Sequence, residues 1–298
     1  MRNKHLSGTG VAIVTPFDKK GAVDTKALVN LVKHLHEGKV DYLVVLGTTG
    51  ESVTLSKEEK KLVMDTVVKA NHHKLPLVVG IGGNNTQEVI DTIAHTDLKP
   101  FEAILSVAPY YNKPNQEGYY QHYKAVAKST KKDIILYNVP GRTGSNVTWE
   151  TQVRIARDFK NIVATKEASG NMEQIMKVIM NKPKDFMVIS GDDNLTLPII
   201  AAGGVGVISV VANAFPKDYS HMVRLWLKGK FEEARALHYG LVNITDQLFA
   251  DGNPGGIKHA LAQLKVCGAT LRLPLCEPND KVKQTLSSLI KAYQKWAR

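Results

Sequence analysis

One lysine of the chain stands where a lysine can act as a nucleophile. Lys166 directly follows Ile162–Thr165, a short apolar run of the kind that forms an interior strand. At the end of such a strand desolvation favours the neutral amine, which attacks carbonyl carbons and can form a Schiff base. A single lysine is more commonly a solvated surface group, so position alone leaves both interpretations open.

Four other positions carry groups that could serve the same chemistry. Tyr137 ends another predicted strand, and a hydrogen-bonded phenol can move the protons that imine and enamine formation require. Thr48 and Thr49 could offer hydroxyl and N–H donors to a carboxylate. Arg142, in a Pro/Gly-rich loop, has the planar fork of donors that suits a carboxylate. The structural alternatives are a core tyrosine, a capped tight turn and a surface salt bridge.

Motifs for other kinds of site, namely phosphate-binding loops and metal ligands, match the sequence poorly. The segment Gly47–Ser52 lacks the Gly-Lys-Ser/Thr ending of a P-loop. The histidine pairs His34/His36 and His72/His73 are one or two residues apart on predicted helices, so neither pair shares a face as metal ligands would. We therefore expect no metal ion and no cofactor.

These residues are embedded in a regular alternation of apolar runs and helical periodicity. The predicted strands are Val11–Thr15, Tyr42–Leu46, Leu77–Gly80, Ala103–Val107, Ile134–Tyr137, Ile162–Thr165, Phe186–Ser190 and Val207–Val211. The predicted helices between them include Thr25–Glu37, Ser56–Ala70, Thr86–Thr96, Gln116–Ser129, Trp149–Asp158 and Met172–Met180. Near-continuous apolar strands indicate a parallel sheet covered on both faces, and eight such units favour a closed (β/α)8 TIM barrel over an open doubly wound sheet.

The rest of the chain reads as helical throughout. Helical periodicity covers Phe231–Leu248, Ile257–Cys267 and Asn279–Trp296, and no Ser/Gly/Pro-rich linker precedes it. We expect a catalytic barrel over residues 1–228 and a C-terminal helical extension over 229–298, packed together as one structural unit. In such a barrel the chemistry is carried by strand ends and the loops after them, which is where the polar, glycine and aromatic residues gather in this sequence.

Composition sets the class of protein. The 298 residues are 43% hydrophobic and 22% charged, which is ordinary for a globular protein. Lysine and arginine exceed the acidic residues by 11 but are dispersed, so the charge indicates solvated lysines or the steering of small anions and not nucleic-acid binding. The two cysteines have no CxxC spacing and suit a reducing cytosol.

Targeting and membrane segments are not predicted. The basic start is followed only by the short apolar stretch Val11–Val14, so we expect the mature protein to begin near Met1 in the cytoplasm. The uncharged segment Asn194–Pro216 is long enough to span a membrane. Because it contains Pro198 and three glycines, we predict a helix followed by a buried strand.

Five motifs together resemble the dihydrodipicolinate synthase family of the pyruvate-dependent class I aldolases (the N-acetylneuraminate lyase superfamily). They run in family order and with family spacing over nearly the whole chain. The motifs are Gly47–Ser52, Pro109–Pro114, Leu136–Gly144, Lys166–Asn171 and Ser190–Asp193.

The resemblance implies a lyase that condenses pyruvate with L-aspartate 4-semialdehyde to 4-hydroxy-tetrahydrodipicolinate, at the start of diaminopimelate and lysine biosynthesis. Lys166 would form the Schiff base, and Tyr137 would be the proton donor and acceptor in a relay with Thr48 and Tyr111. Thr49 and Ile208 would contact pyruvate, and Arg142 would receive the semialdehyde carboxylate. The resemblance also implies a homotetramer built as a dimer of dimers, with Tyr111 contributed across a subunit interface.

Two departures qualify the resemblance. Gly255 and Gly256 replace two rigid residues of a family motif, which concerns local packing and not chemistry. The family's allosteric lysine cleft is matched by Ser52, Asn84, Glu88 and Tyr110, but Lys57 and Lys60 stand where strongly inhibited enzymes have histidines. Inhibition by lysine is therefore left open.

Two other functions remain as alternatives. A pyruvate lyase of sialic or keto-deoxy sugar acids would share the lysine and the tyrosine but lack an arginine at the place of Arg142. A catalytically dead barrel that serves as a basic binding module would need Lys166, Tyr137 or Arg142 to be lost, and all three are present.

Overall fold

The computed structural model describes residues 4–296, so the predicted start near Met1 and the outer limits of 1–228 and 229–298 lie outside the described residues. Eight strands, β1 to β8, are hydrogen-bonded in sequence order and close into a barrel. The predicted (β/α)8 fold is thus confirmed. The chain divides into two compact units, residues up to 10 with 76–208, and residues 11–75 with 209–298. Each unit is described in turn.

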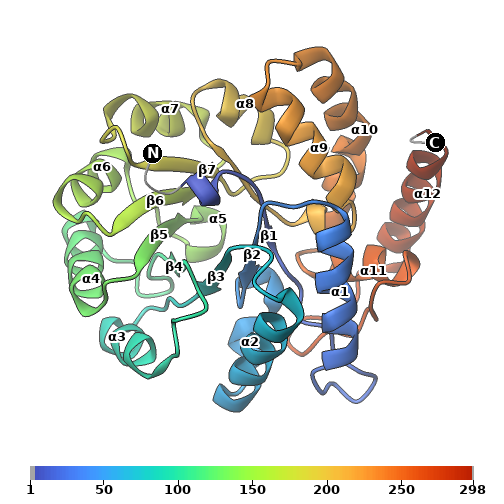
Figure 1. Ribbon diagram of the computed structural model, residues 1–298, viewed down its shortest axis with the longest axis horizontal. Helices are drawn as coiled ribbons and strands as arrows, with labels where there is room; N and C mark the ends of the chain where they lie inside the picture. Colours follow the sequence, from blue (N-terminus) through green and yellow to red (C-terminus); the bar gives the residue numbers. More distant parts are fainter. Residues whose placement is uncertain (1–3, 297–298) are drawn as a thin grey trace. The chain divides into compact units, whose positions relative to one another are not determined.

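The first unit carries strands β3 to β7 and the helices that follow them. Its elements are η1 (Lys4–Leu6), β3 (Leu77–Gly80), α3 (Thr86–His95), β4 (Ala103–Val107), α4 (Gln116–Ser129), β5 (Asp133–Asn138), α5 (Pro140–Thr143), α6 (Trp149–Asp158), β6 (Ile162–Glu167), α7 (Met172–Asn181), β7 (Met187–Ser190) and α8 (Thr196–Ala201). Two strands, β1 (Gly8–Ala12) and β8 (Gly206–Ser209), begin in it. In Figure 1 helices α4, α6 and α7 follow one another along the outside of β5 and β6.

The strands of this unit are parallel and almost entirely buried. Pairing runs from β3 to β4 and on through β5, β6 and β7 to β8, each step parallel. Every residue of β6 is buried, as expected where helices cover one face of a parallel sheet and the barrel interior covers the other. The near-continuous apolar runs of the sequence therefore have a direct structural cause.

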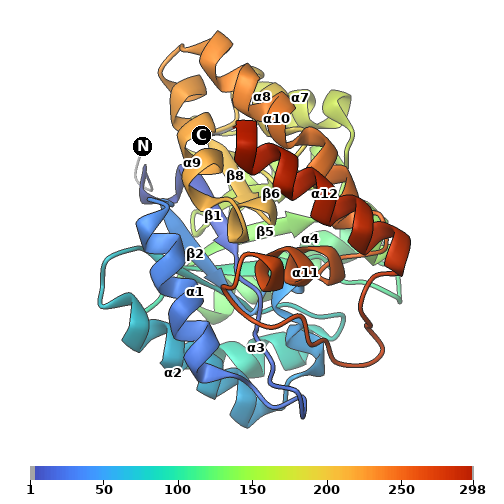
Figure 2. The ribbon, with the colours of Figure 1, turned by 90° about the vertical axis from the view of Figure 1, so that its right-hand side faces the viewer.

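The second unit is mainly helical. Its elements are α1 (Thr25–Glu37), β2 (Tyr42–Val45), η2 (Thr48–Gly50), η3 (Ser52–Thr54), α2 (Lys57–Asn71), η4 (Val211–Asn213), α9 (Pro216–Leu227), α10 (Phe231–Phe249), α11 (Gly255–Gln263) and α12 (Asp280–Trp296). In Figure 2 the last three helices lie against one another, with α12 running over α10 and α11. Three helices of the predicted tail are confirmed, but the tail is not helical throughout, because α11 ends at Gln263 and residues 264–279 form turns and loop.

Helix α10 also packs against α9, across the predicted boundary between residues 228 and 229. The chain turns between these two helices at Lys228–Lys230. The division into a barrel of 1–228 and an extension of 229–298 stays a prediction.

The first strand was placed wrongly. The apolar run predicts Val11–Thr15, whereas β1 is Gly8–Ala12. The amide of Val14 donates to the side-chain oxygen of Asn213, 3.2 Å away, and not to a strand neighbour. The run is buried throughout, but only its first two residues belong to β1, and residues 13–15 are buried in the loop after the strand.

Side-chain capping determines where helices α2 and α3 begin. At Ser56 the structure contains a capping box, in which the Ser56 hydroxyl accepts from the Glu59 amide and the Glu59 carboxylate accepts from the Ser56 amide. For α3 the sequence suggests Thr86 as the start signal. The cap is instead Asn85, whose side-chain oxygen accepts from the amide of Gln87 at 3.1 Å.

The uncharged segment Asn194–Pro216 contains α8 and then β8, as predicted. Among residues 4–296, no helix is long and apolar enough to cross a membrane.

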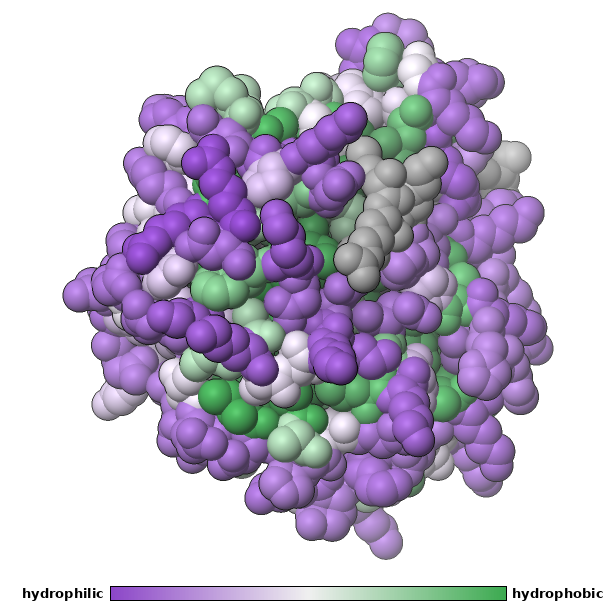
Figure 3. Space-filling model, turned by 60° about the vertical axis from the view of Figure 1, so that its left-hand side comes forward, coloured by the Kyte–Doolittle hydropathy of each residue, from purple (hydrophilic) through white to green (hydrophobic). Residues whose placement is uncertain are grey.

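Surface charge is distributed over many short-range pairs. Exposed partners one turn apart include Lys33 with Glu37 and Lys177 with Glu173. Figure 3 shows hydrophilic side chains over most of the face in view, with smaller apolar areas between them. Exposed pairs of this kind contribute about 0–1 kcal/mol each, so they concern solubility more than the fold.

Gly256, the second glycine of the segment Asn253–Lys258, lies where the structure has no room for a side chain. A Cβ built on Gly256 would lie 2.3 Å from the backbone oxygen of Leu248 and 2.7 Å from its Cα. Helix α11 therefore approaches the end of α10 backbone to backbone. The departure from the family motif has a packing reason within this chain.

We expect Gly256→Ala to lower the free energy of unfolding by about 1–3 kcal/mol, because backbone must move to admit the methyl group. Gly268→Ala is the matched control, since its Cβ would meet only the Phe17 oxygen, at 3.7 Å. Thermal unfolding of both variants measures the difference. Equal midpoints would contradict the tight-contact argument.

Candidate functional site

Lys166 and Tyr137 lie side by side in the first unit. They are Cα partners in the register of β6 with β5, and the Lys166 Nζ lies 4.1 Å from the centroid of the Tyr137 ring. Both residues are buried, Lys166 with 5% of its surface exposed. Lys166 was predicted to follow its strand, but it is a member of β6, which continues to Glu167. The pairing joins the two residues that the sequence suggested independently.

Gly191 has no side chain, and this leaves room for the side chain of Lys166. A Cβ on Gly191 would lie 3.0 Å from Lys166 Cε and 2.7 Å from Ala168 Cβ. The Gly191 amide also donates to the Glu167 carbonyl at 2.7 Å, which fixes this close approach. Sequence reasoning missed this role, although the glycine follows strand β7 directly.

The residue after the lysine is a buried carboxylate held by amides. Glu167 accepts hydrogen bonds from Asn138 Nδ2 at 2.9 Å, from Gln152 Nε2 at 2.7 Å and from the Ser169 amide at 3.1 Å. Gln174 Nε2 is a further donor, at 3.3 Å. Burial raises the pKa of Glu167, and these hydrogen bonds oppose the shift.

Neighbouring residues of a strand point to opposite faces, so Glu167 faces the helix layer while Lys166 faces the interior. Its hydrogen bonds connect the end of β6 to β5, α6 and α7. We infer that Glu167 fixes the strand position from which Lys166 projects. The sequence held a signal for it, an acid within an apolar strand, that the sequence analysis did not use.

In the second unit, the loop after β2 carries Thr48 and Thr49. They form a single 3-10 turn, flanked by Leu46 and Glu51, both in the left-handed backbone region with φ of 59° and 51°. Thr49 is buried and Thr48 is exposed. The amide of Gly50 donates to Gly47 within the turn, so it is not a free donor for a carboxylate. The hydroxyl groups and the amides of Thr48 and Thr49 remain as the candidate ligands.

This loop is held by the C-terminal extension. Lys258 Nζ donates to Glu51 Oε1 and, at 2.8 Å, to the Thr270 carbonyl, and neither charged side chain of the pair is exposed. The other Glu51 oxygen accepts from the Arg272 amide at 3.1 Å. Desolvation lowers the pKa of Lys258, and the Glu51 carboxylate counteracts this shift. The sequence analysis did not identify the pair.

The side chain of Arg272 makes a second connection to the same region. It donates to the carbonyls of Gly21 and Thr54 and to both carboxylate oxygens of Glu59. Hydrogen bonding to Arg272 lowers the pKa of Glu59 to about 2. The chain before α2 is thereby joined to the chain after α11.

The remaining predicted residues occupy varied environments. Arg142 lies on the short helix α5 and is exposed, and Ile208 is buried on β8. Tyr111 is 87% exposed and has a left-handed φ of 70°. Such a backbone conformation in a bulky residue is costly, and it is found most often at functional sites.

Of the four residues matched to the lysine cleft, two are bridged by Asn112. Asn112 donates through Nδ2 to the Asn84 carbonyl at 3.0 Å and through its amide to the Tyr110 carbonyl at 2.8 Å. Glu88 is exposed on α3 in the same unit, and Ser52 lies in η3 of the second unit.

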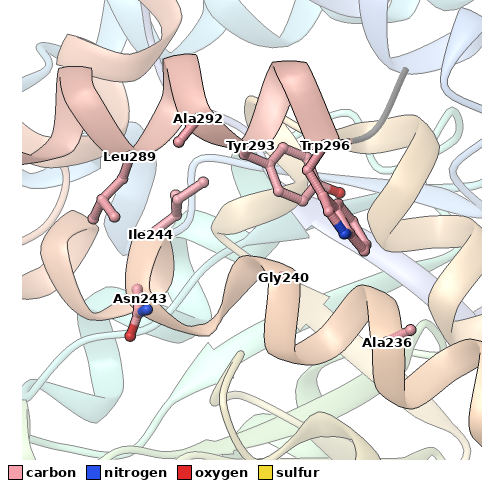
Figure 4. A pocket seen from close by; sticks show the side chains of 8 residues that line it. All are labelled: Ala236, Gly240, Asn243, Ile244, Leu289, Ala292, Tyr293 and Trp296. Carbon is pink, nitrogen blue, oxygen red and sulfur yellow. The ribbon is translucent and has the colours of Figure 1, made fainter.

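Among residues 4–296, no three His, Cys, Asp or Glu side chains are grouped to hold a metal ion. A cavity of about 370 Å³ lies between α10 and α12 and is mostly apolar (Figure 4). It is lined by Ala236, Gly240, Asn243, Ile244, Leu289, Ala292, Tyr293 and Trp296. The Tyr293 hydroxyl donates to Asp218, so this lining offers little chemistry.

A buried lysine beside a tyrosine on adjacent strands of an eight-stranded barrel is an arrangement suited to the class I aldolases, which act through a Schiff base. Within that class, the chain belongs to the dihydrodipicolinate synthetase family, whose model matches residues 5–293.

Individual relatives of this family are similar to the chain over nearly its whole length. The chain is 54% identical over 288 residues to 4-hydroxy-tetrahydrodipicolinate synthase of Flavobacterium psychrophilum, covering 97% of this chain and 98% of the relative. It is 48% identical to the protein of that name from Parabacteroides distasonis, covering 97% and 99%. The crystal structure of dihydrodipicolinate synthase from Thermotoga maritima matches with a TM-score of 0.94 and 39% identity, covering 97% and 98%.

Proposed function

We propose that this protein is a lyase that condenses pyruvate with L-aspartate 4-semialdehyde to form 4-hydroxy-tetrahydrodipicolinate. The observation that carries the proposal is the buried Lys166 amine, 4.1 Å from the Tyr137 ring on the neighbouring strand. Membership of the dihydrodipicolinate synthetase family supports the choice of substrates.

The first half of the reaction makes a nucleophile from pyruvate. The Lys166 amine attacks the ketone carbon of pyruvate, water leaves, and an imine forms. Loss of a proton from the methyl group then gives the enamine. We assign these proton transfers to the Tyr137 phenol, in a relay with Thr48 and Tyr111. Thr49 and Ile208 contact the pyruvate part of the adduct.

The second half closes the ring. The enamine carbon attacks the aldehyde carbon of the semialdehyde, and the aldehyde oxygen takes up a proton to become the hydroxyl group. The amino group of the adduct then attacks the imine carbon, and Lys166 leaves as the free amine. We assign the semialdehyde carboxylate to Arg142, because a guanidinium binds a carboxylate through two parallel donors.

Assembly, location and regulation belong to the same proposal. We assign a homotetramer made of two dimers, and the 87% exposure of Tyr111 supports its contribution to a neighbouring subunit. Sedimentation velocity tests the assembly.

The proposed compartment is the cytoplasm. Calorimetric titration with lysine tests whether it binds at Ser52, Asn84, Glu88 and Tyr110, the residues matched to the family's cleft.

Parallel assays test the proposed function against its alternative. We expect pyruvate to be consumed with L-aspartate 4-semialdehyde and not with N-acetylmannosamine. Turnover of the sugar alone would make the protein a sugar-acid lyase. Turnover of neither substrate, with no pyruvate adduct, would favour the non-catalytic barrel.

Replacing Arg142 should separate the two substrates. We expect Arg142→Ala to raise the KM for the semialdehyde about 10²-fold, because a bidentate carboxylate contact is lost. Borohydride trapping of pyruvate should be unchanged. Arg154→Ala, which removes an exposed arginine paired with Glu117, is the control and should alter neither quantity. Weakened trapping of pyruvate in Arg142→Ala would contradict the assignment.

A further inference from the structure

The hydroxyl of Thr49 already has a partner within the protein, and the direction of that hydrogen bond is informative. Asn253 Nδ2 donates to Thr49 Oγ1 at 3.0 Å, and both residues are buried. A threonine hydroxyl has one hydrogen to donate and two lone pairs with which to accept. Because Asn253 occupies a lone pair, the Thr49 hydrogen must point to a different acceptor.

The group that Thr49 is proposed to bind can only accept. An ionised carboxylate has no hydrogen to donate, so it requires a donor from the protein. A hydroxyl that was free to rotate could present its lone pairs to the carboxylate and repel it. By occupying one lone pair, the Asn253 amide keeps the hydrogen from pointing toward Asn253 and so favours the orientation in which the hydroxyl donates to the carboxylate.

The structure also explains how Asn253 is held in place. It lies two residues before α11, whose Lys258 forms the buried pair with Glu51 and whose Gly256 packs on the Leu248 backbone. Glu51 adopts its left-handed φ of 51° directly after the turn that contains Thr49. A strained residue of this kind persists only when its surroundings fix it, and the ion pair does so here.

We propose that Asn253 is a positioning residue, which orients the Thr49 hydroxyl as a hydrogen-bond donor to the carboxylate of pyruvate. The C-terminal extension thereby contributes to substrate binding without touching substrate. The inference rests on the proposed function, since it requires pyruvate to be the ligand of Thr49.

The test measures the pyruvate concentration that gives half-maximal borohydride trapping. In Asn253→Asp an acceptor replaces the donor, and the Thr49 hydrogen turns toward it. We expect the half-saturating concentration to rise about tenfold or more, which is the loss expected for a hydrogen bond to a charged group. The KM for the semialdehyde, measured at saturating pyruvate, should stay within about twofold. A purely structural role of Asn253 would affect both substrates, and not pyruvate alone.

A double-mutant cycle separates orientation from the added negative charge. In a Thr49→Val background there is no hydroxyl to orient, so Asn253→Asp should have little further effect. An equal effect in both backgrounds would overturn the proposal. Asn243→Asp, an exposed change on α10 of the same unit, controls for charge. If Asn253→Asp does not fold, Asn253→Ala removes the donor and should raise the concentration about threefold.

The wild-type protein distinguishes this inference from the function on which it rests. If it forms no pyruvate adduct, the proposed function fails. If it forms the adduct and the Asn253 variants trap pyruvate at unchanged concentrations, the inference alone fails.

Discussion

Lys166→Ala is expected to lower the rate of condensation by more than about 10⁴-fold, the largest effect of any single substitution proposed, because it removes the amine assigned to form the imine. Borohydride reduction with pyruvate should add a pyruvate-derived mass to the peptide that contains Lys166. That adduct should be missing in the variant, as peptide mass analysis would show.

The control for this experiment is Lys182, a partly buried lysine. Burial lowers the pKa of Lys182, which lies at the end of α7 and has no proposed role. Lys182→Ala should retain both the adduct and the activity. An adduct on any lysine other than Lys166 would refute the assignment, and so would retention of the adduct in Lys166→Ala.

Lys258→Met is expected to destabilise the protein by about 3–5 kcal/mol, because it leaves the buried Glu51 carboxylate without its charge partner. Chemical denaturation of the variant and the wild type measures the loss. Lys230→Met, which breaks an exposed pair with Glu233, should cost less than about 1 kcal/mol.

The double variant Glu51→Leu with Lys258→Met should recover much of the lost stability, since neither charge is then left buried and unpaired. Recovery would show that the cost comes from the uncompensated charge. A double variant less stable than Lys258→Met alone would mean that the pair itself supplies the stabilisation.

Local sequence patterns were enough to predict most elements. The bounds of α1, α4 and α6 coincide with the predicted ranges, because helical periodicity and the residues that end a helix act over a few neighbouring positions. The error at β1 has the same origin. An apolar run indicates burial, and burial in a loop looks like burial in a strand.

The candidate site was predicted in part. Lys166 and Tyr137 were identified because each is a polar group at the end of an apolar run, and the barrel register makes them neighbours. Gly191 was missed as the residue that gives the lysine its space, since a glycine after a strand fits many turns. Glu167 was missed because its four amide donors come from separate segments of the chain.

By itself the sequence determined the eight apolar runs, the helices between them and the chemistry available at Lys166, because these depend on residue type and short-range spacing. Only the tertiary structure decided that Glu51 meets Lys258, 207 residues away, and that Asn253 donates to Thr49, 204 residues away. Such contacts have no local period, since they arise when packing brings two distant segments within hydrogen-bond distance. The orientation of the Thr49 hydroxyl is therefore a property of the fold and not of its motif.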